Sequence, residues 1–344
     1  MSGKRHHFIP QFLQRGFASH NTNKDYYTWV YRKGDINPFN TNIKNIGLEG
    51  YFYSEEKEST LDDMITAAET EYAIFVDELR NNDGVKKIDR KMAANLIAHL
   101  EIRTKNLRDS FRNAGTLLLD GMTNFLTDQD NCERFVKKQV AIEAGKMIDN
   151  ELEKINVPRT LFPIYRHQFA PLIKQKIPEM TEYMRDMMRY ISQNMPSLFE
   201  KSAKSGHIKA LLNNHTPPVK ISVFEKLNYQ VVTTGDFKIP LGDSSVIFNI
   251  EGEQAYKPYF EVDKKLIAVI LPISSTKLLI GSAKKYSLNI SETPYAIASC
   301  SLDYFITSEK SPANQNLAKH ISENAKLVTE SEIENILSDL VMKT

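Results

Sequence analysis

The chain has 344 residues, and its 44 basic and 43 acidic side chains give a net charge of +1. This balance excludes attraction of nucleic acid by the charge of the whole protein, although a local basic patch could still bind it. Its hydrophobic content of 41% is typical of a globular protein, and Cys132 and Cys300 are too few for a disulfide framework or a cysteine zinc site. The first residues lack the apolar core of a signal peptide, and no apolar run reaches membrane-spanning length, so we expect a cytoplasmic protein without a membrane partner.

The first feature along the chain is the segment HHFIPQFLQRGF, residues 6–17. Pro10 favours an extended conformation before it and is tolerated in the first turn of a helix after it. We therefore expect residues 6–9 to be extended and residues 10–17 to form a short helix. In the extended part, His6 and His7 should point to opposite sides.

The polar side chains of this segment suit an anionic ligand. Gln11 and Arg15 lie four residues apart, on one face of the predicted helix. Imidazole, amide and guanidinium groups together can bind a phosphate or a carboxylate. The alternative is a structural segment whose histidines bind backbone carbonyls. The sequence leaves both interpretations open.

The next part of the chain changes from strands to helices. Aromatic runs at 26–31 and 51–53 predict strands. From residue 59 the apolar residues recur at helical spacing, and Asp89 is a plausible N-cap. The predicted helices are 60–80, about 89–111, 130–154, 158–194 and 197–213.

After residue 215 the pattern returns to short alternating runs. The predicted strands are 220–224, 229–234, 245–250, 259–262, 266–270, 277–280 and 304–307, and the predicted helices are 291–301, 312–325 and 331–342. The sequence thus predicts an α+β fold, mostly helical, with an antiparallel sheet built from N-terminal and C-terminal strands around a long helical middle segment. The expected segments are 1–58, 59–214 and 215–344, with the first and last forming one compact unit.

Several stretches resemble, in order, the bacterial proteins grouped as domain-of-unknown-function family 4238. The stretches are HHFIPQFLQRGF (6–17), NIGLEGYFY (45–53) ahead of a helix with Glu69, LEIRT (100–104), LGDSS (241–245) and LPIS (271–274). This chain has Ser244 and Ser245 where the family has Asn and Pro. The resemblance spans roughly residues 5–310 and implies no established activity.

The resemblance and the residue types together indicate one polar site. Its expected catalytic residues are His6, His7, Arg103 and Asp243, and its expected substrate-binding residues are Gln11, Arg15 and Glu101, with Glu69 as an outer candidate. Imidazole with carboxylate is the minimum set for general base catalysis, and a divalent metal is possible there. Guanidinium groups can neutralise a phosphate. We therefore expect nuclease-like phosphodiester hydrolysis, with a bacterial anti-phage defence effector as the biological role.

Other interpretations remain open. The chain could be a non-enzymatic protein that binds an anionic ligand or a nucleic-acid end, or a structural subunit, which an exposed apolar patch on helices 130–194 would favour. His99 is expected to be a satisfied, half-buried histidine. The basic run at Arg103, Lys105, Arg108 and Arg112 is expected to be a solvated helix face.

Overall fold

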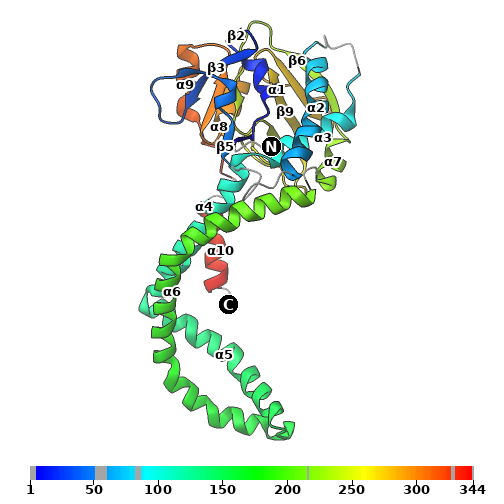
Figure 1. Cartoon of the computed structure of the whole chain (residues 1–344). Coiled ribbons are helices and arrows are strands. Elements are labelled where there is room, and N and C mark those ends of the chain that lie inside the picture. Colours follow the sequence, from blue (N-terminus) through cyan, green and yellow to red (C-terminus); the bar gives the residue numbers. More distant parts are fainter. Residues whose placement is uncertain (1–4, 51–59, 82–86, 215–216, 327–329, 343–344) are drawn as a thin grey trace. The chain divides into compact units, whose positions relative to one another are not determined.

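The computed structural model describes residues 5–50, 60–81, 87–214, 217–326 and 330–342 (Figure 1). The chain forms two compact units: residues 1–111 with 203–327, and residues 112–202 with 328–344. The helices at 60–80 and 90–102, which we expected in the helical middle segment, belong to the first unit together with the strands. The predicted strand at 51–53 lies outside the described residues.

Antiparallel sheets form the first unit, as predicted. One sheet has the order β2 (His20–Thr22), β3 (Asp25–Arg32), β11 (Tyr304–Thr307) and β7 (Leu241–Gly242), with β4 (Phe39–Asn42) also paired to β3. It joins strands from both ends of the chain, which confirms the α+β class. A second sheet has the order β6 (Asn228–Thr233), β10 (Lys277–Ser282), β9 (Leu266–Ser274) and β8 (Ile247–Ile250). A two-stranded ribbon pairs β1 (Arg5–His7) with β5 (Leu48–Gly50).

Short and medium helices pack around these sheets. The α-helices are α1 (Gln11–Gln14), α2 (Thr60–Arg80), α3 (Arg90–Ile102), α7 (Pro218–Phe224), α8 (Thr293–Cys300) and α9 (Pro312–Leu317), and the 3-10 helices are 15–17, 43–45 and 318–320. Helix α2 contacts α1 and β9, and α3 contacts α7 and β6. Their apolar faces join the strands in one continuous core that also contains Phe8, Ile9 and Phe12 of the N-terminal segment.

The second unit is helical. Helix α4 (Lys105–Thr127) begins in the first unit and continues into the second, which also contains α5 (Gln129–Lys154), a 3-10 turn at 159–161, most of α6 (Phe162–Asn214) and α10 (Glu330–Met342). Its core is a small cluster around Cys132, Val136, Ile177 and Met188. Within the described ranges, none of the helices has the length and apolar character that crossing a membrane requires.

Two helix boundaries differ from the prediction. The helix expected at 89–111 breaks after Ile102, where Arg103 ends α3 and the Thr104 hydroxyl accepts a hydrogen bond from the Leu107 amide at 3.3 Å. The break expected at Pro196 is absent, since α6 continues through it. In the preceding turn the Asn194 side-chain amide donates to the Tyr190 carbonyl at 2.7 Å. Pro196 itself has no N–H to donate to the Ser192 carbonyl.

Two predicted strands are also wrong. Residues 220–224 form α7, because Pro218 occupies its first turn and the buried Lys220 and Phe224 lie four residues apart on one face. Residues 259–262 form no strand, because the Phe260 amide donates to the Glu101 carboxylate at 2.7 Å instead of to a neighbouring strand.

Candidate functional site

The N-terminal motif is held by the β1–β5 ribbon. His7 pairs with Leu48, and the amides of Phe8 and Ile9 both donate to the Gly47 carbonyl, at 2.8 and 3.1 Å. The backbone then turns at Pro10 into α1. The extended segment followed by a short helix is therefore as predicted.

The two histidines have different surroundings, as expected for neighbours in a strand. His6 is buried, with 3% of its surface exposed, whereas His7 is half-buried. The side-chain amide nitrogen of Gln11 lies 3.0 Å from His7 Nε2. Because an amide N–H is a donor, Nε2 accepts this hydrogen bond and carries a lone pair.

Arg103 connects this segment to two helices. Its side chain is 1% exposed, and Nη1 donates to the Glu69 carboxylate and to His99 Nε2, both at 2.6 Å. Its Nη2 donates to the His7 carbonyl oxygen at 2.7 Å. A guanidinium cannot accept a hydrogen bond, so His99 Nε2 is unprotonated in this arrangement.

We call His7, Gln11, Glu69, His99 and Arg103 the His7 cluster. Its members come from β1, α1, α2 and α3, which the fold brings together from distant parts of the chain. The Glu69 side chain is 25% exposed, so a carboxylate, an imidazole and an amide face outward over a buried cation. This arrangement can bind a polar substrate and transfer a proton.

The ring of Tyr72 packs against the buried side of the cluster. Its centroid lies 5.1 Å from that of His99, and burial raises the pKa of Tyr72 to about 12. Tyr72 therefore stays neutral and supports the cluster by packing.

Asp243 forms its hydrogen bonds with a different segment of the first unit, residues 302–304. Its carboxylate accepts hydrogen bonds from the backbone amides of Leu302 and Asp303 at 2.7 Å and of Tyr304 at 3.2 Å. Burial raises the pKa of Asp243 to about 7, against the lowering effect of these amides. These contacts fix the backbone at the start of β11.

The two remaining substrate-binding candidates have separate partners. Arg15 is exposed, and its guanidinium carbon lies 5.7 Å from the centre of the Tyr26 ring. Glu101 is fully buried and accepts from Lys220 Nζ at 2.6 Å. Burial raises the pKa of Glu101 and lowers the pKa of Lys220. The charge of Lys220 lowers the pKa of Glu101, and the charge of Glu101 raises the pKa of Lys220.

A pocket of about 660 Å³ lies beside the ribbon. It is lined by Phe8, Arg32, Lys33, Asp35, Asn45, Ile46, Gly47, Leu48, Glu49, Lys105, Asp303 and Tyr304. Burial by itself would lower the pKa of Lys105, but its bond to Asp303 at 2.6 Å and the nearby Asp109 raise it. Three basic and three acidic side chains thus line this pocket. Of the acidic ones, Asp303 pairs with Lys105 and Glu49 pairs with Arg108, and Arg32 and Lys33 are exposed.

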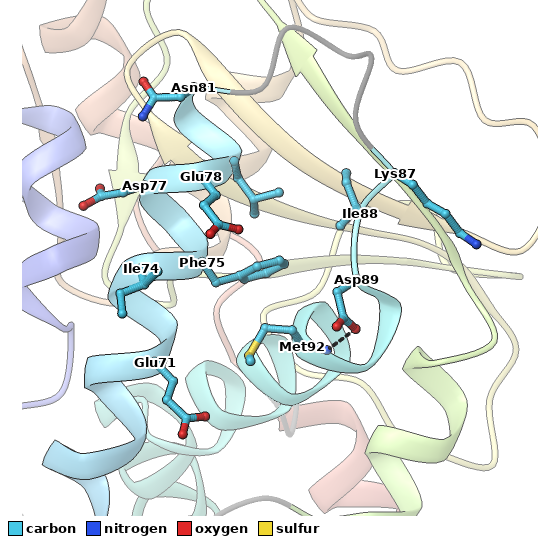
Figure 2. A pocket seen from close by; sticks show the side chains of 11 residues that line it. Glu71, Ile74, Phe75, Asp77, Glu78, Asn81, Lys87, Ile88, Asp89 and Met92 are labelled. Carbon is cyan, nitrogen blue, oxygen red and sulfur yellow. Dashed lines mark hydrogen bonds between the residues drawn. The ribbon is translucent and has the colours of Figure 1, made fainter.

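A larger pocket of about 790 Å³ lies between α2 and the start of α3 (Figure 2). Phe75, Ile88 and Met92 form its apolar part. Its acidic lining residues are Glu71, Asp77, Glu78 and Asp89, and its basic lining residue is Lys87. This excess of negative charge disfavours a phosphate-bearing ligand.

Three contacts were missed at the sequence level. His99 is a partner of Arg103, a pairing that their spacing of four residues could have indicated. Lys220 is the partner of Glu101. Arg108 pairs with Glu49 and is only 8% exposed. The expectation of a solvated helix face is therefore wrong for Arg108, and also for Arg103, which is 1% exposed. Among the described residues, no group of three or more His, Cys, Asp or Glu side chains is arranged to hold a metal ion.

Comparison with known proteins gives one match. A family model with the description "Protein of unknown function (DUF4238)" matches residues 5–321. No curated protein and no solved structure gives a significant match. The matched region contains the His7 cluster, Asp243 and both pockets, and it covers most of the sequence. The chain therefore belongs to the DUF4238 family.

Proposed function

We propose that this protein is a hydrolase that cleaves phosphodiester bonds in the manner of a nuclease, with the His7 cluster as its catalytic site. The observation that carries the proposal is the contact of Arg103 with Glu69, His99 and the His7 backbone, beside the His7–Gln11 pair. Imidazole, carboxylate, guanidinium and amide groups from four elements meet at one partly exposed place. These are the groups that phosphodiester hydrolysis needs.

The geometry supports a distinct role for each group. His7 Nε2 has a lone pair and can take a proton from an attacking water once Gln11 releases it. Glu69, held by Arg103, can orient that water or the substrate. The buried Arg103 provides the positive charge that favours a phosphate whose negative charge grows in the transition state.

The other predicted site residues have supporting roles in this proposal. Asp243 fixes the start of β11 through three amides, and the buried His6 is part of the ribbon strand that presents His7. Exposed Arg15 is available to contact the substrate backbone. The role of an anti-phage effector is an extension of this proposal, and phage plating on cells that express the wild type or His7→Ala tests it.

The test of the catalytic proposal is cleavage of single-stranded and double-stranded DNA, RNA and bis(p-nitrophenyl) phosphate, with Mg²⁺, with Mn²⁺ and with a chelator. We expect His7→Ala to lower kcat by about 10²–10⁴-fold, the usual contribution of a general base, and to leave substrate binding in place. His20→Ala is the matched control, because His20 is an exposed histidine stacked on Tyr27 away from the cluster. Absence of cleavage by the wild type, or equal rates for wild type and His7→Ala, would contradict the proposal.

A second candidate function is non-catalytic binding of a phosphate-bearing ligand or a nucleic-acid end. The observation that favours it is the pair of exposed cations, Arg32 and Lys33, in the lining of the pocket of about 660 Å³, where the acidic Glu49 and Asp303 are each paired with a cation. Cations at the edge of a cleft attract phosphate in a manner that weakens with salt.

This second function predicts binding without turnover. Lys33→Glu should weaken the binding of a 5′-phosphorylated oligonucleotide, measured by fluorescence anisotropy. It should also reduce the slope of log binding constant against log salt concentration by about one unit. Lys238→Glu makes the same charge change at an exposed position outside the pocket lining and is the control. Equal affinities for both variants would exclude the pocket as the binding site.

A further inference from the structure

The pocket of about 660 Å³ beside the ribbon has an apolar wall as well as charged residues. Phe8, Ile46 and Tyr304 in its lining are buried members of the core of the first unit, and Leu48 is half-buried. The volume lies within the range of about 300–1,000 Å³ that is usual for small-molecule sites, and a phosphate group alone would fill little of it. A ligand of this pocket should therefore carry a larger, partly apolar group beside its phosphate.

The exposed charges of the pocket are mainly positive. Arg32 and Lys33 are exposed, and the only partner of Lys33 Nζ among the described residues is the neutral hydroxyl of Ser322. Of the three acidic lining residues, Asp35 is exposed and the other two are each paired with a cation. Two exposed cations against one exposed carboxylate favour a phosphate at this part of the pocket.

The Tyr304 hydroxyl is a buried donor in the wall of the same pocket. Tyr304 is 6% exposed, and its hydroxyl has no hydrogen-bond partner in the part of the chain that the structure describes. The Gly47 amide, also in the lining, lowers the pKa of Tyr304, but an N–H can only donate to the phenol oxygen. The phenolic proton is therefore left without an acceptor.

The surroundings of this hydroxyl favour a neutral acceptor over an anionic one. Burial, followed by the charges of Asp243 and Asp303, raises the pKa of Tyr304 well above its usual value, so the hydroxyl keeps its proton. Arg32 acts in the opposite direction, but more weakly than either carboxylate. An anionic oxygen at this buried position would meet both the desolvation cost and the two carboxylates, whereas a carbonyl oxygen meets neither penalty.

A carbonyl acceptor distinguishes between the nucleobases. Guanine presents O6 and thymine or uracil presents O4 as an acceptor, where adenine and cytosine carry an amino group. An amino group at the same place would leave the phenolic proton of Tyr304 unpaired. A buried donor without a partner is unfavourable, so the hydroxyl should select the bases that have the carbonyl.

We propose that this pocket binds a nucleoside 5′-phosphate with a keto base, namely guanine, uracil or thymine. The base lies against the apolar wall and accepts a hydrogen bond from the Tyr304 hydroxyl, and the phosphate lies at Arg32 and Lys33. The proposal rests on the second candidate function and specifies its ligand. The nucleotide is either free or the 5′ end of a strand.

Isothermal titration calorimetry of the full chain tests the proposal with GMP, UMP, AMP, CMP, ribose 5-phosphate and inorganic phosphate. We expect GMP and UMP to bind about tenfold more tightly than AMP and CMP, which is the effect of one hydrogen bond to a buried donor. Ribose 5-phosphate and phosphate should bind more weakly than GMP. Oligonucleotides that begin with a 5′-phosphorylated G or A then distinguish the two sources, because a preference for G at the end assigns the pocket to a strand.

Tyr304→Phe is the decisive variant, because it removes the hydroxyl and keeps the ring. It should weaken GMP and UMP about tenfold and leave AMP and CMP unchanged, so that the preference disappears. Because the hydroxyl has no partner among the described residues, the Tm should stay the same or rise. A purely structural role would instead lower the Tm and weaken all four nucleotides alike. Tyr295→Phe is the matched control, because Tyr295 is 44% exposed and outside the pocket lining, and it should change no affinity.

The outcomes separate this proposal from the function on which it rests. Equal affinities for the four nucleotides, ribose 5-phosphate as tight as GMP, or a keto preference that survives in Tyr304→Phe would overturn the proposal and leave a phosphate site in place. If none of the phosphate compounds binds, the second candidate function itself is wrong. If Tyr304→Phe does not fold, the preference of the wild type decides.

Discussion

Replacement of Asp243 by Asn should reveal what a buried carboxylate contributes to the first unit. One oxygen of Asp243 accepts from Leu302, and the other accepts from Asp303 and Tyr304. Asparagine has a single oxygen acceptor, and its NH₂ group faces an N–H donor at the other position. In the more favourable orientation of the asparagine side chain, its oxygen still accepts hydrogen bonds from the amides of Asp303 and Tyr304. The Leu302 amide then has no acceptor.

The loss of folding stability in Asp243→Asn depends on pH. A buried donor without an acceptor costs about 1–3 kcal/mol, which is the expected loss at pH 5. The folded-state pKa of Asp243 is about 7 and the reference value is 3.8, so the folded state keeps its proton when the unfolded state has lost it. The contribution of Asp243 to stability is therefore complete below pH 3.8 and is lost as pH rises to 7.

Between pH 5 and pH 8 the wild type should thus lose about 3 kcal/mol through this group, from a change of about two pKa units. Asp243→Asn has no such titration. Its stability deficit should shrink across that range and approach zero or reverse.

Urea unfolding followed by tryptophan fluorescence measures this effect in the relevant unit. Trp29 is the single tryptophan, and it lies opposite Thr307 in the β3–β11 pair that follows the Asp243 contacts. The control is Asp236→Asn, because Asp236 is exposed. A deficit that grows from pH 5 to pH 8 would refute the reasoning, since it would mean that the three amides hold the carboxylate ionised in spite of its burial.

Changes at one buried ion pair and at two glycines test the packing of the fold, with the same unfolding measurement. Glu101→Gln leaves the buried ammonium of Lys220 without its counter-charge and should cost about 3–5 kcal/mol. The double change Glu101→Leu with Lys220→Met should recover only part of this loss, because it removes the partners of the Phe260 amide and carbonyl. Gly16→Ala places a Cβ 2.4 Å from the Ile273 carbonyl oxygen and should destabilise by about 1–3 kcal/mol. Gly206→Ala in helix α6 meets no atom within 4 Å and should instead be neutral or stabilise by up to about 1 kcal/mol. Unchanged stability of Glu101→Gln, or equal effects at the two glycines, would contradict these expectations.

Local signals in the sequence were sufficient where an element is held by its own residues. Asp89 was predicted as an N-cap, and its carboxylate accepts from the amides of Lys91 and Met92 at 2.9 and 3.1 Å. The strands around Leu266 and Tyr304 were also predicted. The segments 220–224 and 259–262, both predicted as strands, share the partner Glu101, which binds Lys220 and the Phe260 amide. Alternation over four or five residues cannot show such a distant partner.

The same distinction applies to the candidate site. A spacing of four residues along helix α3 joins His99 to Arg103, so this pair was accessible to sequence reasoning. His7 and Gln11 have the same spacing but lie in a strand and in the following helix, so the helical rule does not predict their contact. By contrast, the pair of Arg108 with a residue of β5 joins positions 59 residues apart. A charged residue on a helix is usually solvated, and only the folded chain shows that this one is buried.

The ribbon between the two candidate sites makes the competing functions separable by experiment. Leu48 and Glu49, the β1–β5 partners of His7 and His6, both line the pocket of about 660 Å³. His7 binds Gln11 in the His7 cluster. A ligand in the pocket would therefore influence His7 through the ribbon, since the Gly47 carbonyl holds the amide that follows His7. If both proposals hold, Lys33→Glu should change KM and leave kcat intact, whereas His7→Ala should do the reverse. A fall in kcat alone for Lys33→Glu would show that the pocket is not a binding site for the substrate.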